Sequence, residues 1–353
     1  QMSPNASRCL MHLGAFEAAE RAGFLPRSAV LRDGLTGSEI FRAPLGVAAT
    51  ERWGAPYLHV HRSDLLDALA EAALAAGTEI RAGQRVVGWT DDMGWPLVVT
   101  SRPEEADAQG NASEERVEAD LIVVADGLRS RLREQIAGAA DPRFAGQVAW
   151  RALVGTERLP EGLVAPDATV WAGPGRHVVT YYLRGGRLVN LVAVVETEEW
   201  AAEGWAEPGD PDELRAAFAG WHPDVERLLA GVESAMRWGL FLRSAPAAWT
   251  RGRAALLGDA CHPMLPFMAQ GAAMAIEDAV VLARRLGEEG SVRDALMAYR
   301  AERRPRTDAV QAVSRENGRL YHREDTPMRR IGDFAISMVS QTMPWVAAAR
   351  FDW

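Results

Sequence analysis

The segment GDACHPMLPFMAQGAA, which begins at Gly258, combines features that suit a flat, anionic ligand. Asp259 can accept hydrogen bonds from a sugar-like polyol, and two prolines stiffen the turn that follows it. The small residues from Gly271 to Ala273 predict a helix start, where backbone N–H groups are unpaired and the helix dipole is positive. An ordinary strand–turn–helix with a well-capped start explains the same residues, so both interpretations stay open.

Other residues of reactive type carry a weaker signal. We interpret His262 as structural rather than catalytic, and Cys261 beside it as a small buried residue. The basic run RAERRPR is typical of a solvated helix face rather than of a nucleic-acid contact. No metal site is predicted, because five further histidines lack the spacing of metal ligands: His12, His59, His61, His222 and His322.

The elements that position these residues alternate between strands and helices. RAALLGDA predicts an apolar strand that delivers Gly258 and Asp259 to the carboxyl end of a sheet, where open α/β sheets bind ligands. LIVVADG predicts a buried parallel strand. Residues 61–77 predict a helix with Ser63 as its N-cap and Gly77 as its stop. Residues 103–120 predict a surface hairpin or an insertion between strands.

From about residue 147 to 243 the chain turns to short segments rich in β-branched and aromatic residues. RHVVTYYLRGGRLVNLVAVV is the clearest hairpin, with Gly185 and Gly186 at its turn. From Ser291 onward the pattern is mostly helical, with a kink expected at Pro305. The fold class is therefore α/β, with a β-rich domain that interrupts an α/β domain and a helical region at the end.

Composition narrows the class of protein. With 353 residues, of which 48% are hydrophobic, the chain can form one large or two ordinary domains. A formal net charge of -9 argues against nucleic acid or an anionic membrane as a partner. Two cysteines fit a reducing compartment, and we expect a cytoplasmic protein. We find no apolar run long enough to span a bilayer and no signal-peptide pattern.

Several segments together resemble one family. GDACHPMLPFMAQGAAMAIEDA resembles the second flavin motif of the single-component FAD-dependent aromatic hydroxylases, which include salicylate, 3-hydroxybenzoate and 6-hydroxynicotinate hydroxylases. ADLIVVADGLRSRLR resembles the family's Asp-Gly motif, with Val124 in place of a usual glycine. HRSDL resembles the helix start whose arginine reaches the flavin. The resemblance implies a Rossmann-like FAD-binding domain of the aromatic hydroxylase type, interrupted by a β-sheet substrate domain and followed by C-terminal helices.

The resemblance also implies a reaction. FAD would be the cofactor, NADH or NADPH the reductant, and O2 the oxidant, with an aromatic ring hydroxylated through a flavin hydroperoxide. Pro266, Gly271 and Ala272 match residues that line the flavin ring, and Asp259 matches the ribityl contact. The full set of cofactor-binding residues carried over is Arg62, Asp126, Gly127, Gly258, Asp259, Pro266, Gly271, Ala272 and Ala273.

The implied substrate is a small phenolic or N-heteroaromatic acid between the β-rich domain and the flavin. His177, Val179 and Tyr181 share one strand face. His177 and Tyr181 resemble a pair in relatives that act on such rings, and with Pro266 they are the expected catalytic residues. A half-buried sheet face without chemistry remains the alternative, and Arg151 suits this cavity and the protein surface equally.

Phe267 bears on the identity of the ring. Relatives that decarboxylate 6-hydroxynicotinate often carry a histidine at this position, so the resemblance favours salicylate or 3-hydroxybenzoate. Larger polyketide-like phenols stay open, as do the ring position and whether hydroxylation is decarboxylative.

One departure from the family concerns its first strand and G-x-G-x-x-G turn, which we do not find. The chain is expected to begin just after that unit, which takes at least ~30 residues. Two alternatives to a monooxygenase therefore stay open: a flavin oxidase or dehydrogenase on the same scaffold, and a non-catalytic fragment that binds no FAD.

The expected domains are residues 1–145 and 246–300 for FAD binding, 146–245 for the substrate, and 301–353 for C-terminal helices. The expected partners are the aromatic substrate and O2, with no nucleic acid and no integral membrane segment. A homodimer is left open.

Overall fold

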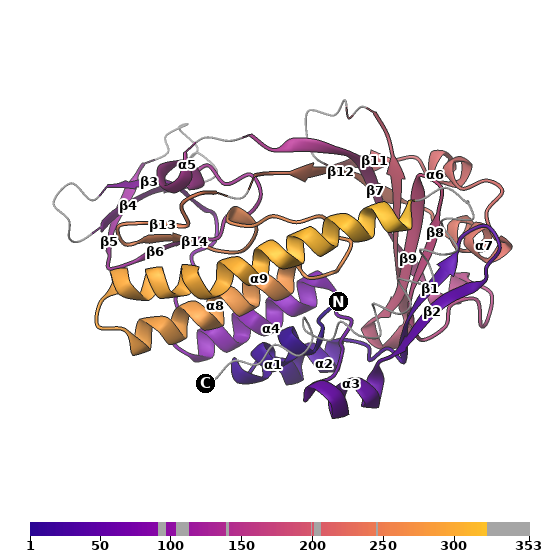
Figure 1. The fold of residues 1–353 in the computed structure, drawn as a ribbon, viewed down its shortest axis with the longest axis horizontal. Coiled ribbons are helices and arrows are strands. Elements are labelled where there is room, and N and C mark those ends of the chain that lie inside the picture. Colours follow the sequence, from indigo (N-terminus) through magenta and orange to yellow (C-terminus); the bar gives the residue numbers. More distant parts are fainter. Residues whose placement is uncertain are drawn as a thin grey trace.

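The computed structural model describes residues 1–90, 97–103, 113–138, 141–198, 200, 206–244 and 246–322. It has the mixed α/β fold predicted from the sequence (Figure 1). A large sheet lies at one end of the molecule and two small sheets lie at the other, with helices alongside. In these ranges, none of the helices is long and apolar enough to cross a membrane.

The large sheet has the strand order β11-β12-β7-β10-β9-β8-β1-β2. Neighbouring strands are antiparallel, except that β1 and β8 are parallel. The strands are β1 (Ser28–Asp33), β2 (Glu39–Pro44), β7 (Arg143–Gly155), β8 (Ala168–Gly173), β9 (Arg176–Leu183), β10 (Leu188–Glu196), β11 (Ala206–Gly209) and β12 (Ala235–Leu242).

The boundary of this sheet differs from the expected substrate domain. β1 and β2 come from the range expected to bind FAD, yet β1 pairs with β8. The physical reason is that β8 would otherwise be an unpaired edge strand. β1 pairs with it and buries apolar side chains such as Val30 and Leu31. Residues far apart in the chain therefore build one sheet.

The predicted hairpin is formed by β9 and β10, with Leu183 opposite Leu188. Its turn runs through Arg184, Gly185 and Gly186, all with positive φ, a conformation that glycine adopts easily. Arg184 is held there by two hydrogen bonds to the Asp64 carboxylate, at 2.8 and 3.0 Å.

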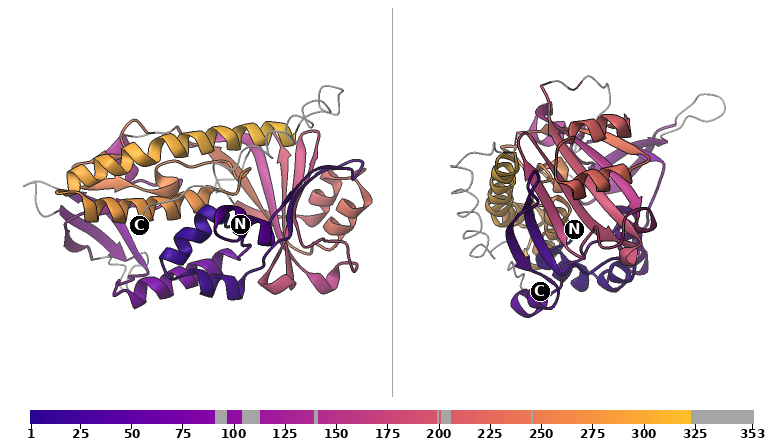
Figure 2. Two further views of the ribbon diagram at one scale, coloured as in Figure 1. Left: turned by 60° about the horizontal axis from the view of Figure 1, so that its bottom comes forward. Right: turned by 90° about the vertical axis from the view of Figure 1, so that its right-hand side faces the viewer.

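Helices α6 (Pro211–Ala217) and α7 (Pro223–Ala230) cover one face of the large sheet (Figure 2). Alternate residues of β7, including Trp150, point into the core beneath these helices. The residues between them, including Arg151, point to the opposite face, which looks toward the long helices. This second face forms a wall of the cavity described below.

The two small sheets lie at the other end. β6 (Ile122–Val124) pairs in parallel with β14 (Ala254–Leu256), as predicted for these apolar runs, and β13 (Thr250–Arg251) pairs with β14. β4 (Leu97–Pro103) lies between β3 (Gln84–Thr90) and β5 (Glu115–Ala119). The strands on either side of the expected hairpin are thus neighbours; residues 104–112 lie outside the described ranges. A short helix, α5 (Arg133–Ala137), follows β6.

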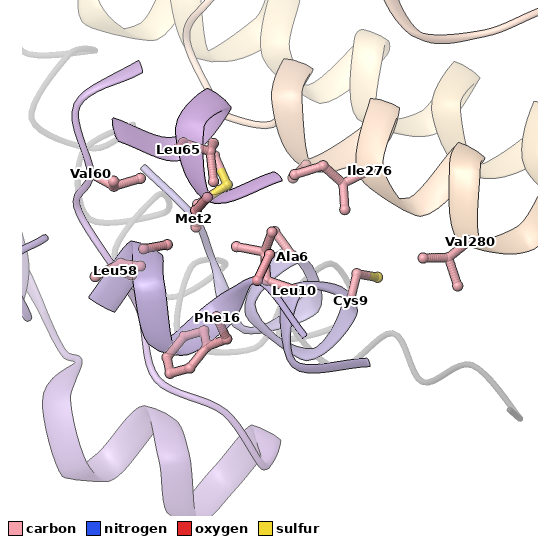
Figure 3. Close-up of a cluster of buried hydrophobic side chains, with 14 of the residues drawn as sticks. Met2, Ala6, Cys9, Leu10, Phe16, Leu58, Val60, Leu65, Ile276 and Val280 are labelled. Atoms are coloured by element: carbon pink, nitrogen blue, oxygen red, sulfur yellow. The ribbon is translucent and has the colours of Figure 1, made fainter. Parts of the chain in front are cut away.

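A second core joins the N-terminal segment to the central helices (Figure 3). Met2, Ala6 and Leu10 pack with Leu65 and Ile276. The helices involved or nearby are α1 (Pro4–His12), α2 (Phe16–Ala22), α3 (Gly46–Trp53), α4 (Arg62–Ala75) and α8 (Gly271–Glu288). α9 (Val292–Tyr321) packs on α8, runs through Pro305 as one helix, and reaches the large sheet (Figure 1).

The helix predicted over residues 61–77 is α4, but the expected N-cap, Ser63, is wrong. His61 is the cap, because its ring Nδ1 accepts a hydrogen bond from the Ser63 N–H at 3.3 Å. Histidine here replaces the usual short polar side chain. Gly77 follows the helix with φ +88°, and the Thr78 N–H closes the end on the Ala73 carbonyl at 3.0 Å, as the glycine stop predicts.

Candidate active site

A cavity of about 1280 Å³ lies between the start of α8 and the large sheet. One wall is formed by the starts of α4 and α8 and the turn before α8, and the other by β7, β9 and β10. Cofactor and substrate residues predicted from distant parts of the sequence meet here: Arg62, His177, Tyr181, Asp259, Pro266, Gly271 and Ala272. The structure therefore places predicted cofactor-binding residues and predicted substrate-binding residues in the same cavity.

The first turn of α8 offers the cavity backbone N–H groups and little side chain. Gln270 is the N-cap residue, but its side chain does not cap the helix and instead donates to Ser3 Oγ at 2.8 Å. A Cβ added at Gly271 would have its nearest neighbours at 3.9 Å, on Asp259 and Met264. The helix dipole makes this open surface favourable for a flat group that carries negative charge.

Two charged side chains face this end of the cavity, Asp259 and Arg62. Among the described residues, neither side chain has a hydrogen-bond or ion-pair partner. Each is open toward the cavity, and protein surrounds Asp259 on its other sides, so burial raises the pKa of this carboxyl. Their polar groups are available to a ligand.

One face of α9 holds the turn that contains Pro266. Three side chains spaced three residues apart lie on the same face of a helix. Each donates a hydrogen bond to a carbonyl of the turn: Gln311 to Pro263 at 2.7 Å, Ser314 to Leu265 at 2.6 Å, and Asn317 to Phe267 at 3.1 Å. Ala269 ends the turn with φ +52°, a strained value that these contacts help to maintain.

A buried ion cluster fixes α8 behind this surface. Glu277 and Asp278 are fully buried, and Arg303 of α9 bonds both, at 2.6 and 2.7 Å. Arg306 adds two hydrogen bonds to Glu277 at 2.7 Å each. Such charges are tolerated in the interior only because they are paired, so the prediction of a solvated helix face for RAERRPR is wrong at Arg303 and Arg306.

His262 belongs to this cluster, which fits its structural interpretation. Its Nε2 lies 2.5 Å from Asp278 Oδ2, and the same oxygen accepts the Gly258 N–H at 3.0 Å. The Gly258–His262 turn is thereby tied to α8. Cys261 is fully buried, as predicted, and burial raises the pKa of its thiol.

The opposite wall carries the predicted substrate residues. His177, Val179 and Tyr181 all face the cavity, as strand alternation predicts. Arg151 faces it too, which settles the question left open by the sequence. Val179 pairs with Val192, which pairs with Arg151, so two strand spacings place Arg151 about 10 Å across the sheet from Val179.

Burial sets the charges on this wall. It lowers the pKa of His177 well below the usual value, with the neighbouring His322 as a second cause, so His177 is neutral at pH 7. It raises the pKa of Tyr181, which therefore keeps its proton. Burial also lowers the pKa of Arg151, whose guanidinium lies over Trp238 at 5.3 Å. The wall offers a neutral base, a hydroxyl donor and a cation.

Four other predicted cofactor residues do not line this cavity. Gly258 lies behind Asp259, where its N–H binds Asp278 and its φ is +60°. Ala273 is fully buried in the core around α1 and α8. Asp126 is exposed after β6, and Gly127 beside it has φ +85°. The cofactor role of these four residues stays a prediction.

Sequence reasoning missed the roles of His322, which contacts His177, and of Glu196, which contacts His322. His177 and His322 are 145 positions apart, so no local spacing could relate them. In the part of the chain that the structure describes, no group of three His, Cys, Asp or Glu side chains could hold a metal ion.

The first wall fits the ring and polyol portions of FAD. The open surface at Gly271 and Ala272 admits a flat ring, and the uncapped α8 N–H groups suit its negative charge when reduced. The Asp259 carboxylate can accept hydrogen bonds from ribityl hydroxyls, and Arg62 adds a cation.

Comparison with known proteins gives a consistent picture. A family described as an FAD binding domain matches residues 24–314. The chain is 37% identical to the 3-amino-4-hydroxybenzoate 2-monooxygenase PtnB3 of Streptomyces platensis over 334 residues, 94% of this chain and 81% of that protein. It is 36% identical to the 6-hydroxynicotinate 3-monooxygenase of Pseudomonas fluorescens over 333 residues, 92% and 82% of the two chains. A solved salicylate hydroxylase substrate complex matches with a TM-score of 0.82 at 26% identity, covering 99% of this chain and 87% of that one.

Proposed function

This chain belongs to the FAD-binding-domain family that includes aromatic-acid monooxygenases, and from that membership we propose that it hydroxylates a small aromatic acid with FAD, NADH or NADPH, and O2. The observation that carries the proposal is one cavity, of which one wall fits a flavin and the other carries both a neutral base and a cation. When bound, FAD supplies the redox chemistry that activates O2 with electrons from the nicotinamide.

The proposed flavin site uses the residues of the first wall. Gly271 and Ala272 of α8 contact the ring, Pro266 shapes the turn against it, Asp259 binds the ribityl chain, and Arg62 reaches the ring from α4. Asp126, Gly127, Gly258 and Ala273 are proposed on resemblance alone. Residues 1–145 and 246–300, without β1 and β2, are the proposed FAD-binding part of the molecule, and residues 301–353 the C-terminal helical part.

The proposed substrate is a hydroxylated aromatic carboxylate. The neutral His177 accepts the phenolic proton, which makes the ring more electron-rich and easier to hydroxylate. Tyr181 donates a hydrogen bond to the ring substituents, and Arg151 binds the carboxylate. Phe267, from the turn before α8, reaches across to this wall, with its ring 5.4 Å from that of His177, and helps to exclude water. A hydroxybenzoate such as salicylate or 3-hydroxybenzoate has these groups.

The first test is the visible spectrum of the purified protein, followed by NADH and NADPH oxidation with hydroxybenzoates and hydroxypyridine carboxylates. We expect flavin absorption, substrate-stimulated oxidation, and one atom of ¹⁸O from ¹⁸O2 in the product. Oxidised product without ¹⁸O would identify an oxidase or dehydrogenase instead. A colourless protein that FAD cannot reconstitute would refute the enzyme function for this chain.

A cytoplasmic location is proposed because both cysteines are free and the reductant is a cytoplasmic nucleotide. Assembly as a homodimer stays a prediction, which the mass of the protein in solution would test.

A further inference from the structure

Three side chains, in contact one after another, connect the cavity with the protein surface. His177 Nδ1 lies 2.6 Å from His322 Nε2, and His322 Nδ1 lies 2.8 Å from Glu196 Oε1. His177 faces the cavity, the His322 side chain is 2% exposed, and the Glu196 side chain is 53% exposed. The buried base His177 is therefore connected to bulk water through the enclosed imidazole of His322 and the exposed carboxylate of Glu196.

Backbone contacts hold the three groups together. His322 follows the end of α9, and its carbonyl accepts the Gly175 N–H at 3.1 Å. The Gly175 carbonyl in turn accepts the Glu196 N–H at 2.9 Å. Gly175 has φ +65° in the turn between β8 and β9, directly before the strand that carries His177. This one turn thus fixes the end of α9 against both strands.

The carboxylate decides where the protons sit. An ionised carboxylate can only accept, so the shared proton lies on His322 Nδ1. His322 Nε2 is then an acceptor, and the proton between the two rings lies on His177 Nδ1. His177 Nε2 is left with a lone pair, and it has no hydrogen-bond partner among the described residues. Gln147 also approaches His322 Nδ1, but at 3.3 Å, and the shorter contact to a charged acceptor is the stronger one.

We propose that His322 and Glu196 form a proton relay, which carries the substrate's phenolic proton from His177 to solvent. The substrate O–H bond breaks as an N–H bond forms at His177 Nε2. The Nδ1 proton of His177 moves to His322 Nε2, and the Nδ1 proton of His322 moves to the Glu196 carboxylate, which releases it to water. The phenolate keeps the electron pair, and no oxidant or reductant takes part.

The surroundings of the histidines explain why a relay is needed. Phe267 and Tyr321 pack against the His177 ring at centroid distances of 5.4 and 5.2 Å, and no cation or anion contacts it among the described residues. Among the described residues, the titratable groups that contact the pair are Tyr321 from α9 and Glu196 from β10, while Arg151 and Tyr181 lie on the same cavity wall. A proton that stopped at His177 would create a buried cation, which is costly. Moving it to Glu196 leaves both rings neutral.

This inference rests on the proposed function, and its test separates the two. The variant is Glu196→Gln, which keeps the shape of a surface residue but removes the charged acceptor. The matched control is Glu198→Gln, the same change at an exposed residue two positions along the chain. His322→Gln is the second variant, with its circular dichroism spectrum compared with that of the wild type to confirm folding.

The probe is 3-hydroxy-4-nitrobenzoate, whose phenolate absorbs visible light and whose phenol does not. We expect the wild type and Glu198→Gln to bind it as the phenolate below its pKa in solution. Glu196→Gln and His322→Gln should bind it as the phenol, with its bound pKa at least about one unit higher. With a hydroxybenzoate substrate, both variants should lose about tenfold or more in kcat at neutral pH, recover at higher pH, and show an altered solvent deuterium isotope effect.

The outcomes are distinct. If the wild type hydroxylates hydroxybenzoates while Glu196→Gln ionises the probe and turns over like the wild type, the relay is wrong and the function stands. If the wild type neither hydroxylates a phenol nor ionises the bound probe, the proposed function falls with it. A loss of activity in Glu196→Gln without any change in probe ionisation or isotope effect would show a purely structural role and would also overturn the relay.

Discussion

Two arginines show how the same side chain can serve the fold or a ligand. Arg303 is fully buried and shares two buried carboxylates. Arg151 is an exposed side chain that lines the cavity, and its guanidinium lies over the ring of Trp238 with no carboxylate beside it among the described residues. A cation that faces a cavity without an acidic partner is expected to attract an anion. At the scale of single residues, Arg151 is therefore the group most available to the substrate's carboxylate.

Replacing Arg151 with methionine should raise KM for a hydroxybenzoate by about 10- to 100-fold, because a hydrogen bond to a charged group contributes about 1.5–3 kcal/mol. The matching hydroxybenzamide, which has no charge, should be affected little. Steady-state kinetics with both compounds measures this. Arg116→Met, on exposed β5, is the control and should resemble the wild type. An equal loss for acid and amide would contradict carboxylate binding by Arg151.

His59 should make the fold sensitive to acid. It is fully buried, and burial lowers its pKa well below the usual value, which outweighs the opposite effect of the Tyr182 backbone. Below pH 6.5 this histidine takes up a proton in the unfolded chain but stays neutral in the native protein. The free energy of unfolding therefore decreases as the pH is lowered below 6.5, by up to about 1.4 kcal/mol per pH unit for one group. Above this pH the contribution of His59 is constant.

His59→Phe should therefore reduce the pH dependence of stability between pH 6.5 and 5 by up to one proton, with little effect at pH 8. Urea unfolding at several pH values measures it. His177 and His322, whose pKa values are also lowered, should keep part of the slope. An unchanged slope in His59→Phe would mean that this ring is protonated in the native state.

At the scale of elements, the position of α8 depends on charges that lie outside it. The side chain of its N-cap residue does not bond to the helix itself, and α9 supplies the arginines that balance Glu277 and Asp278. α1 adds a polar contact from the other side, because Asn5 donates to Glu277 at 2.8 Å. The helix start that faces the cavity is thus held by two other helices.

Arg303→Met should lower the free energy of unfolding by about 3–5 kcal/mol, because it leaves two buried carboxylates short of a cation. Arg304→Met removes the neighbouring arginine, whose contact to Asp308 is long and partly exposed at 3.6 Å, and should cost less than about 1 kcal/mol. Chemical unfolding of both variants gives the comparison. Similar losses would contradict the special role of the buried cluster.

The elements themselves were largely predictable, since their signals are local. The β9–β10 hairpin, the apolar strands β6 and β14, the body of α4 and the start of α8 follow from alternation, apolar runs and small residues. The His61 cap was missed because histidine is an unusual N-cap. The addition of β1 to β8 was missed because strand pairing between distant segments leaves no local pattern.

At the scale of the whole molecule, the cavity is formed by segments that are far apart in the sequence, and no single segment forms it alone. Sequence reasoning found both walls, because His177 and Tyr181 share a strand face and Gly271 starts a helix. The orientation of Arg151, and the contact of His322 with His177, depend on packing between distant segments. Residue types can be read locally, but such neighbours need the folded chain.

Removing FAD from the holoenzyme should loosen both walls at once. Ligand binding adds stability by mass action, about 2.7 kcal/mol at a ligand concentration of 100 times Kd. Hydrogen exchange measured by mass spectrometry should speed up in residues 264–273 and 177–183, with a lower Tm. α6 and α7, on the far face of the sheet, are the internal control and should be unchanged (Figure 2). Faster exchange there and unchanged walls would place the cofactor elsewhere.

The long helix α9 has a consequence for how such proteins can diverge. It carries Arg303, which binds the buried carboxylates of α8, and the three side chains that hold the turn, and it ends beside the large sheet, where His322 follows it. One inserted or deleted residue would turn everything beyond it by about 100° and shift it by about 1.5 Å. Insertions and deletions should thus be excluded from residues 303–322, while the sheet face can change residue by residue, so substrate preference can drift by substitution on a frame of constant length.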